Sequence, residues 1–331
     1  MRLVRRGGWL VLALSILACA AEPPAAVKAP PRRPEPPAAE PVASTQGSPA
    51  PNPTAAPAET APSFKQAVVS RERTRIVVLE YHDFGNVDRP SCVSPDSFKA
   101  QLDWLTENKI EVVRTSNVID FYTRDIELPE RVAVVMIDDA LTSAKNHAFP
   151  ALKARGMPFT LAVNTAPVEM AHEDALSWAD LKTMLESGLV EIASHSHKHG
   201  HMANLTDFEN NRELNVSKAL IEEKLGVVPR AFVYPFGSVN PTVQKLTELA
   251  GYEVGFDALG PVATSLSPRF RLPRTAVTRE MKLWHFKGMW KREFGASAPQ
   301  KTAPPDAAPI LKGGAQLGGP GDAAGRTAAG D

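Results

Sequence analysis

Four histidines lie within seven residues near the middle of the chain, in the segment 195–201 (HSHKHGH). His195 and His199 are four positions apart, so one helical turn would bring both imidazoles onto the same face. Imidazole is a common neutral metal ligand and suits zinc, cobalt, nickel or iron. We therefore expect His195 and His199 to bind a metal, and His197 and His201 to be exposed or to lie behind the ligands. A histidine-rich loop without an ion is the alternative.

Two adjacent carboxylates, Asp138 and Asp139, directly follow the apolar run 132–137. Carboxylates at the end of a buried strand cost free energy unless cations or hydrogen bonds compensate them. Neighbours in extended backbone point to opposite sides, so we expect one to bind a metal and the other to handle a proton. Two histidines and one aspartate leave coordination positions open, where bound water becomes a nucleophile near neutral pH. A solvated turn or a helix N-terminus is the alternative.

A tight turn is expected where the apolar run 231–234 leads into Pro235-Phe236-Gly237. Proline followed by an aromatic residue and glycine favours such a turn, which can direct a main-chain N–H inward. A donor in that place could stabilise an oxyanion. A plain turn without a catalytic role is the alternative.

Short apolar segments alternate with helical patterns between about residues 70 and 295. The run 132–137 is apolar throughout, as in a strand that is covered on both faces. This alternation predicts a parallel α/β sheet or barrel, with the chemistry at the carboxyl ends of the strands. The expected strands are 76–81, 110–113, 132–137, 159–163, 190–193, 231–234 and 254–256. We expect one helix that begins at 94 and a second that ends at 153. Three further helices are expected over 178–187, 205–225 and 241–250.

The three groups of residues follow the motif order of a known family. Over about residues 75 to 276, the chain resembles the NodB-like polysaccharide deacetylases, carbohydrate esterase family 4. The family's Thr-Phe-Asp-Asp-Gly corresponds to 136–140 (MIDDA), and its His-Ser/Thr-x-x-His to 195–199 (HSHKH). Its third motif, an arginine followed by Pro-Tyr/Phe-Gly, corresponds to Arg230 and 235–237 (PFG). The resemblance implies a distorted (β/α) barrel of about seven parallel strands and a hydrolase that removes acetyl groups.

One branch of this family is especially similar near the start of the domain. Poly-N-acetylglucosamine deacetylases have a Tyr-His after the first strand and then a Ser-Pro-x-x-Phe-x-x-Gln-Leu helix. The chain has Tyr81-His82 and 94–102 (SPDSFKAQL) at these places. The resemblance implies an acetylated, N-acetylglucosamine-type polysaccharide of the cell surface or cell wall as substrate.

The resemblance also implies a metal site made of Asp139, His195 and His199. The ion would be divalent, with zinc as the first choice and cobalt or nickel as alternatives.

Catalytic roles are implied in the same way. Asp138 would be the general base, the Phe236 amide would help to form the oxyanion hole, and Arg274 would orient the base. The acid that protonates the leaving amine would be His285, His82 or the base acting twice. A surface-helix role for His285 is an equal alternative.

The chain departs from the family pattern at the first motif, where Ala140 replaces glycine. A positive φ at this alanine would cost roughly 1 kcal/mol or more. The Asp-x-x-Asp-Trp motif is not visible, and Leu283-Trp284-His285 is the single possible match to the late Leu-x-His motif.

The N-terminal segment predicts export and lipid anchoring. Basic residues precede a short apolar run, and 16–19 (ILAC) resembles a lipobox, so 1–18 is expected to be a lipoprotein signal peptide with Cys19 acylated. An ordinary cleaved signal is the alternative. We expect a Pro/Ala-rich linker over 19–70, the deacetylase domain over 71–295 and a disordered tail over 296–331. The domain would then lie outside the cytoplasm, at the outer membrane if the source is Gram-negative.

Charge and cysteine content limit the partners. Lys plus Arg equals Asp plus Glu, so the formal net charge is zero and nothing indicates nucleic-acid binding. We expect a monomer bound to the membrane through Cys19. Cys92 is then left without a partner, as a free buried thiol.

Two other functions remain open from the sequence. A catalytically weak carbohydrate-binding lipoprotein could keep the same fold, and Ala140 favours this slightly. The intact Asp-Asp and His-x-x-x-His pairs argue against it, because a binding module needs neither. The third possibility is an esterase that removes O-acetyl groups from polysaccharide.

Overall fold

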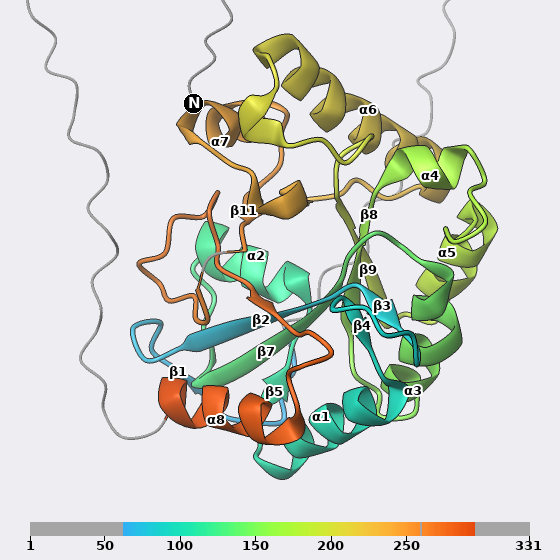
Figure 1. Ribbon diagram of the computed structural model, residues 1–331. Helices are drawn as coiled ribbons and strands as arrows, with labels where there is room; N and C mark the ends of the chain where they lie inside the picture. Colours follow the sequence, from blue (N-terminus) through green and yellow to red (C-terminus); the bar gives the residue numbers. More distant parts are fainter. Residues whose placement is uncertain (1–61, 259, 295–331) are drawn as a thin grey trace, which may run out of the picture. The chain divides into compact units, whose positions relative to one another are not determined.

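The computed structural model describes residues 62–258 and 260–294, and a parallel sheet is its centre (Figure 1). Seven parallel strands follow one another in the order β11-β10-β9-β8-β7-β2-β12, and an eighth, β5, pairs with the first part of β7. The bounds are β2 Arg75–Tyr81, β5 Glu111–Val112, β7 Arg131–Ile137, β8 Phe159–Val163, β9 Val190–Ser194, β10 Ala231–Val233, β11 Val254–Phe256 and β12 Thr275–Ala276. The predicted parallel α/β architecture is confirmed.

The segment 272–276 links the two ends of this sheet. Leu272 forms a parallel bridge with Phe256 at the end of β11, and Thr275 pairs with Leu79 in β2. The strands therefore curve toward a barrel, and their carboxyl ends gather at one edge. Arg274 lies in the middle of this link, directly before β12.

Helices surround the sheet, and Figure 1 shows α8 beside α1 and α6 beside α7, in agreement with their contacts. Their bounds are α1 Pro95–Glu107, α2 Thr115–Thr123, α3 Phe149–Lys153, α4 Thr165–Glu169, α5 Trp178–Glu186, α6 Asp207–Leu225, α7 Pro241–Leu249 and α8 Leu283–Phe294. Short π- and 3₁₀-helices are η1 Ala144–Ala148, η2 Met202–Asn204 and η3 Pro235–Gly237. Two small sheets pair β1 (Val68–Val69) with β6 (Leu128–Pro129) and β3 (Asp83–Phe84) with β4 (Cys92–Val93).

Local sequence explains where several helices begin and end. Ser94 accepts a hydrogen bond from the Ser97 N–H at the start of α1, and Thr206 forms a capping box with Glu209 at the start of α6. Gly226, with φ 71°, ends α6 in the left-handed conformation that glycine adopts without strain.

Alternate residues of the strands enter two different cores. Val77 and Leu79 in β2 pack under the helices with Phe98, whereas Ile76 and Val78 face the inside of the curved sheet. This two-residue period decides where the polar residues at the strand ends lie. Glu80 continues the inward row of Ile76 and Val78, so its carboxylate is buried.

The expected signal peptide 1–18, Cys19 and the tail 296–331 lie outside the described residues. Within the expected linker 19–70, Val68 and Val69 form β1, so ordered structure begins before position 71. Cys92 is buried and forms no disulfide in the part of the chain that the structure describes. Among those residues, no helix has the length and apolar character needed to cross a membrane.

Candidate active site

The turn after β7 carries the two predicted carboxylates. The Asp138 N–H still donates to the Tyr81 carbonyl at 2.8 Å, which extends the ladder with β2 by one residue. The backbone then turns through Asp139 and Ala140, which have φ values of 68° and 51°. Two successive non-glycine residues in the left-handed region store strain of about 1–2 kcal/mol each. The alanine that replaces the family's glycine therefore does adopt the strained conformation.

The histidine segment leaves β9 as a loop, so the prediction that one helical turn brings His195 and His199 together is wrong. Positive φ angles at Ser196 (65°) and His199 (59°) reverse the chain instead. Glu213 of α6 stabilises this loop, because its Oε2 accepts the N–H groups of His197 at 2.9 Å and Lys198 at 2.6 Å. His195 and His199 do lie together, but a loop and not the expected helical turn brings them there.

The structure brings Asp139, His195 and His199 together. Asp139 Oδ1 lies 3.4 Å from His199 Nε2 and 3.8 Å from His195 Nε2, and the two Nε2 atoms are 3.0 Å apart. His195 Nδ1 lies 2.9 Å from the Val233 carbonyl, which can only accept, so Nδ1 carries the proton and Nε2 presents a lone pair. A lone pair, a second imidazole nitrogen and a carboxylate oxygen thus face one another.

This donor set fits a divalent cation. Ligand bonds of about 2.0–2.2 Å in tetrahedral zinc sites place neighbouring ligand atoms about 3.3–3.5 Å apart, close to the observed spacings. Burial lowers the pKa of His195 below its ordinary value, although Asp138 and Asp139 oppose the effect, and this favours the neutral imidazole that a metal requires. The three residues predicted as metal ligands therefore have suitable positions and chemistry.

Asp138 occupies a different environment from its neighbour. Its side chain is 1% exposed, and Arg274 Nη1 donates to both carboxylate oxygens at 2.9 Å. Burial acts to raise the pKa of Asp138, but the charges of Arg274 and the neighbouring histidines outweigh it and lower the pKa below its ordinary value. Asp138 is thus an ionised carboxylate that Arg274 holds beside the cluster, with Oδ2 3.7 Å from His195 Nε2.

Glu80 was not predicted from the sequence. Its Oε2 lies 3.2 Å from Arg274 Nη2, in an ion pair that is not aligned as a hydrogen bond. Burial raises the pKa of Glu80, whereas Arg274 acts to lower it. The sequence did contain a signal for Glu80. It is a charged residue among the apolar residues of 76–81, and it has the same two-residue period as the inward-facing Ile76 and Val78.

Of the two histidines considered as acids, the structure places His82 near Asp138 and His285 on the surface of α8. His82 Nε2 lies 3.9 Å from Asp138 Oδ2 and 3.7 Å from Glu80 Oε1. His285 lies on the exposed face of α8, where its ring contacts Trp284. No contact among the described residues joins His285 to the triad.

The turn after β10 places an aromatic ring beside the triad. Phe236 has φ 58°, and its 60%-exposed ring lies 4.5 Å from the His199 ring and stacks on His201 at 4.0 Å between centroids. Gly237 is required here, because its φ is 62° and a Cβ would lie 2.8 Å from Asp257 Oδ1. The catalytic role of the Phe236 N–H stays a prediction.

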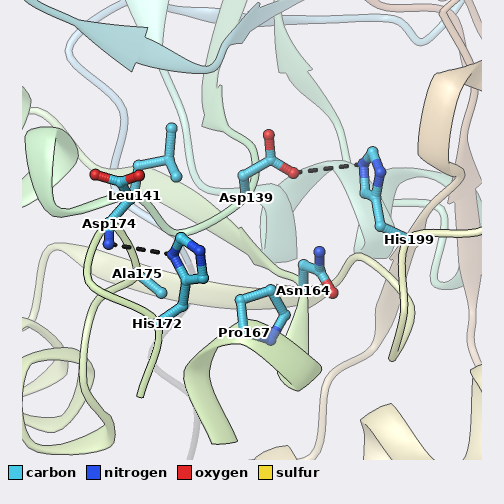
Figure 2. A pocket seen from close by; sticks show the side chains of 8 residues that line it. All are labelled: Asp139, Leu141, Asn164, Pro167, His172, Asp174, Ala175 and His199. Atoms are coloured by element: carbon cyan, nitrogen blue, oxygen red, sulfur yellow. Dashed lines mark hydrogen bonds and ion pairs between the residues drawn. The ribbon is translucent and has the colours of Figure 1, made fainter. Parts of the chain in front are cut away.

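A pocket of about 300 Å³ opens next to the triad (Figure 2). It is lined by Asp139, Leu141, Asn164, Pro167, His172, Asp174, Ala175 and His199. The loop after α4 contributes one wall, and the bridge between Leu141 and Ala175 ties that loop to the turn after β7. The six lining residues other than Asp139 and His199 are scattered over 141–175, and none of them was predicted from the sequence.

Residues 125–255 match the family model described as polysaccharide deacetylase. This match identifies a polysaccharide deacetylase domain in the chain. Over 202 residues, which are 56% of this chain and 68% of the relative, the deacetylase is 25% identical to poly-β-1,6-N-acetyl-D-glucosamine N-deacetylase of Staphylococcus aureus.

Solved structures agree with this assignment. IcaB from Ammonifex degensii matches the deacetylase with a TM-score of 0.60 and 27% identity, over 66% of this chain and 97% of that chain. The Streptococcus pyogenes deacetylase PplD, solved in complex with acetate, has a TM-score of 0.62 and 21% identity, over 65% and 98% of the two chains, and supports the fold alone. The NodB-like deacetylase fold expected from the motifs is confirmed.

Proposed function

We propose that this deacetylase is a metal-dependent enzyme that hydrolyses the acetamido groups of an N-acetylglucosamine-type polysaccharide of the cell surface or cell wall. The observation that carries the proposal is the convergence of Asp139, His195 and His199, whose ligand atoms lie within 4.8 Å of one another. Similarity to a poly-N-acetylglucosamine N-deacetylase supports the choice of polymer.

Asp139, His195 and His199 would hold the metal, and three protein ligands leave coordination positions open. Zinc is the proposed ion, since imidazole and carboxylate ligands suit it, and cobalt or nickel could replace it. When bound, such an ion supplies Lewis acidity, which polarises the acetyl carbonyl and makes water a stronger nucleophile near neutral pH.

The chain's own residues handle the protons. Asp138 is the proposed general base, because it is ionised and borders the triad. Arg274 keeps it in place through two hydrogen bonds. His82, 3.9 Å from Asp138, is the proposed acid that gives a proton to the leaving amine. The Phe236 N–H is proposed to donate to the oxygen on which negative charge develops.

The proposed location rests on the sequence. A lipoprotein signal at 1–18 and an acylated Cys19 would anchor the protein to the cell envelope, at the outer membrane if the source is Gram-negative. The linker would then hold a monomeric domain of about 71–295 near its substrate outside the cytoplasm. Labelling with radioactive palmitate, compared between the wild type and Cys19→Ala, tests the anchor.

The experiment that tests the enzyme is acetate release from a panel of acetylated glycans. The panel includes β-1,6- and β-1,4-linked N-acetylglucosamine oligomers, peptidoglycan and an O-acetylated xylan. The protein is stripped with a chelator and then supplied with zinc, cobalt or nickel. We expect release from the N-acetylated oligomers that disappears with chelation and returns with metal. Release from the xylan alone would indicate an esterase, and no release from any glycan would indicate a binding protein.

A further inference from the structure

Asn164 directly follows β8, the strand that lies between β7 and β9 in the sheet. The neighbouring strands carry Asp139 and His195 at their ends, so Asn164 stands between the two halves of the triad. Its side chain is 8% exposed and lines the same pocket as Asp139 and His199. Figure 2 shows its amide below the Asp139–His199 pair.

The Asn164 side chain makes no hydrogen bond with the residues that the structure describes, and its Oδ1 is buried without a partner. This is unusual for its position, because asparagine before a helix normally accepts a hydrogen bond from the helix N-terminus. Here the first N–H groups of α4, those of Thr165 and Ala166, donate to carbonyls of the histidine loop at 3.2 and 2.8 Å. The Asn164 amide therefore has no capping role.

A buried polar group without a partner destabilises a fold and is rare in native proteins, so it needs a reason. The surroundings of Asn164 supply one. A pocket of about 300 Å³ is at the small end of ligand sites, large enough for one sugar unit. The apolar part of the pocket wall is formed by Leu141, Pro167 and Ala175, and the uncharged amide of Asn164 lines the same pocket.

An acetamido group matches this lining, because it has a methyl group, one hydrogen-bond donor and one acceptor. A carboxamide side chain also has both a donor and an acceptor. We propose that Asn164 binds the acetamido group of the reacting sugar through its side-chain amide, as a substrate-binding residue at the metal site. This inference rests on the proposed N-deacetylase function and names a contact within it.

Asn164→Ala tests the proposal through three measurements on the full chain. We expect kcat/KM for N-acetylglucosamine oligomers to fall about 10- to 100-fold, the change expected for one lost hydrogen bond in a desolvated site. Bound zinc per chain should stay unchanged. The melting temperature should stay equal or rise, because the variant removes a polar group that has no partner in the free protein.

Asn240→Ala is the matched control. Asn240 also stands directly before a helix, α7, but its Oδ1 accepts a hydrogen bond from the Val243 N–H at 2.9 Å and its Nδ2 donates to the Ala203 carbonyl at 3.4 Å. Its removal should lower the melting temperature and leave kcat/KM within about twofold of the wild type. The two variants should therefore differ in opposite ways: Asn164→Ala should lose kcat/KM and keep its melting temperature, and the control should do the reverse. If Asn164 had only a structural role, both variants would lose stability.

A binding measurement distinguishes a failure of this inference from a failure of the proposed function. The affinity of metal-free protein for a β-1,6-linked N-acetylglucosamine trimer is measured by calorimetry, and Asn164→Ala should weaken it at least fivefold. If the wild type binds the trimer but releases no acetate, the proposed function fails while weaker binding by the variant still supports the contact. Equal affinity and equal kcat/KM in the variant and wild type would overturn it, as would a lower melting temperature or loss of zinc.

Discussion

Two clusters of charged and imidazole groups adjoin at the turn after β7, and each could be read as a metal site. Asp139, His195 and His199 form one, and Glu80, His82 and Asp138 form the other. The second already contains a cation, because Arg274 contacts both Glu80 and Asp138. In the first, the Nε2 atoms of His195 and His199 lie 3.0 Å apart, and Asp139 Oδ1 lies 3.4 Å from that of His199. The adjacent carboxylates therefore have different partners: Asp138 faces a guanidinium, and Asp139 faces two imidazoles.

Backbone strain also differs between the two clusters. Asp139 and His199 in the first cluster have positive φ, as has Ser196 between the two histidines, whereas the groups of the second cluster come from regular strand ends. Unfavourable backbone conformations persist where surrounding contacts over-determine them, and they concentrate at functional sites. The strained backbone therefore belongs to the cluster of Asp139, His195 and His199, and the second cluster is an ion network around Arg274.

The largest effect should follow the removal of a residue from the first cluster. Asp139→Ala and His195→Ala each leave two of the three protein ligands, which is too few for a stable zinc site. We expect bound zinc, measured by atomic absorption, to fall below about 0.1 per chain. Acetate release should become undetectable at ordinary zinc concentrations. A variant that retained one zinc per chain would show that the ion binds elsewhere.

Asp138→Asn should separate the two clusters. The amide keeps the shape of the side chain but cannot take a proton, so acetate release should fall about 10²- to 10⁴-fold. Bound zinc should remain close to one per chain, because Asp138 belongs to the second cluster. Full activity in Asp138→Asn would remove Asp138 as the base. Simultaneous loss of zinc would show that the carboxylates share the ion.

Arg274→Met should affect stability as well as catalysis. It leaves Glu80 and Asp138 as buried carboxylates without their counter-ion, which costs about 3–5 kcal/mol of unfolding free energy. Acetate release should also fall, by about 10- to 100-fold, because Asp138 loses its orientation. Urea denaturation measures the first effect. The matched control is Arg269→Met, since Arg269 pairs with Glu248 and both side chains are exposed, so its loss should cost less than about 1 kcal/mol. Equal losses in the two variants would mean that the buried network contributes nothing special.

The sequence predicted the first cluster better than the second, for a physical reason. Buried parallel strands are continuous apolar runs, so the run 132–137 and the residues that follow it are visible in the sequence. His195 directly follows a second strand, 190–194, and the two sets meet because parallel strands end at one edge. The order of the strands was enough to predict this meeting, whereas the loop conformation that places His199 was not visible in the sequence.

The second cluster depends on contacts that no local pattern reports. Arg274 reaches Asp138 across 136 positions, because 272–276 links the two ends of the sheet. That link is a two-residue strand, too short to give a periodic signal. The family resemblance proposed Arg274, while Glu80, its other partner, was missed. Likewise, the positive φ of Ser196 replaced the expected helical turn, and side-chain spacing alone cannot distinguish the two.

The smallest effect is expected from Glu80→Gln, and it tests the division between the clusters most closely. The substitution removes one negative charge but leaves Arg274 with both of its hydrogen bonds to Asp138. Activity should therefore change by less than about fivefold, and zinc content should not change, since one neutral hydrogen-bonding group replaces a charged partner. A loss as large as that of Asp138→Asn would mean that Glu80 takes the proton, because it too is a buried carboxylate, with Oε1 3.7 Å from His82. Measuring the two isosteric variants side by side, on the same oligomer and with the same zinc loading, decides which carboxylate next to Arg274 is the base.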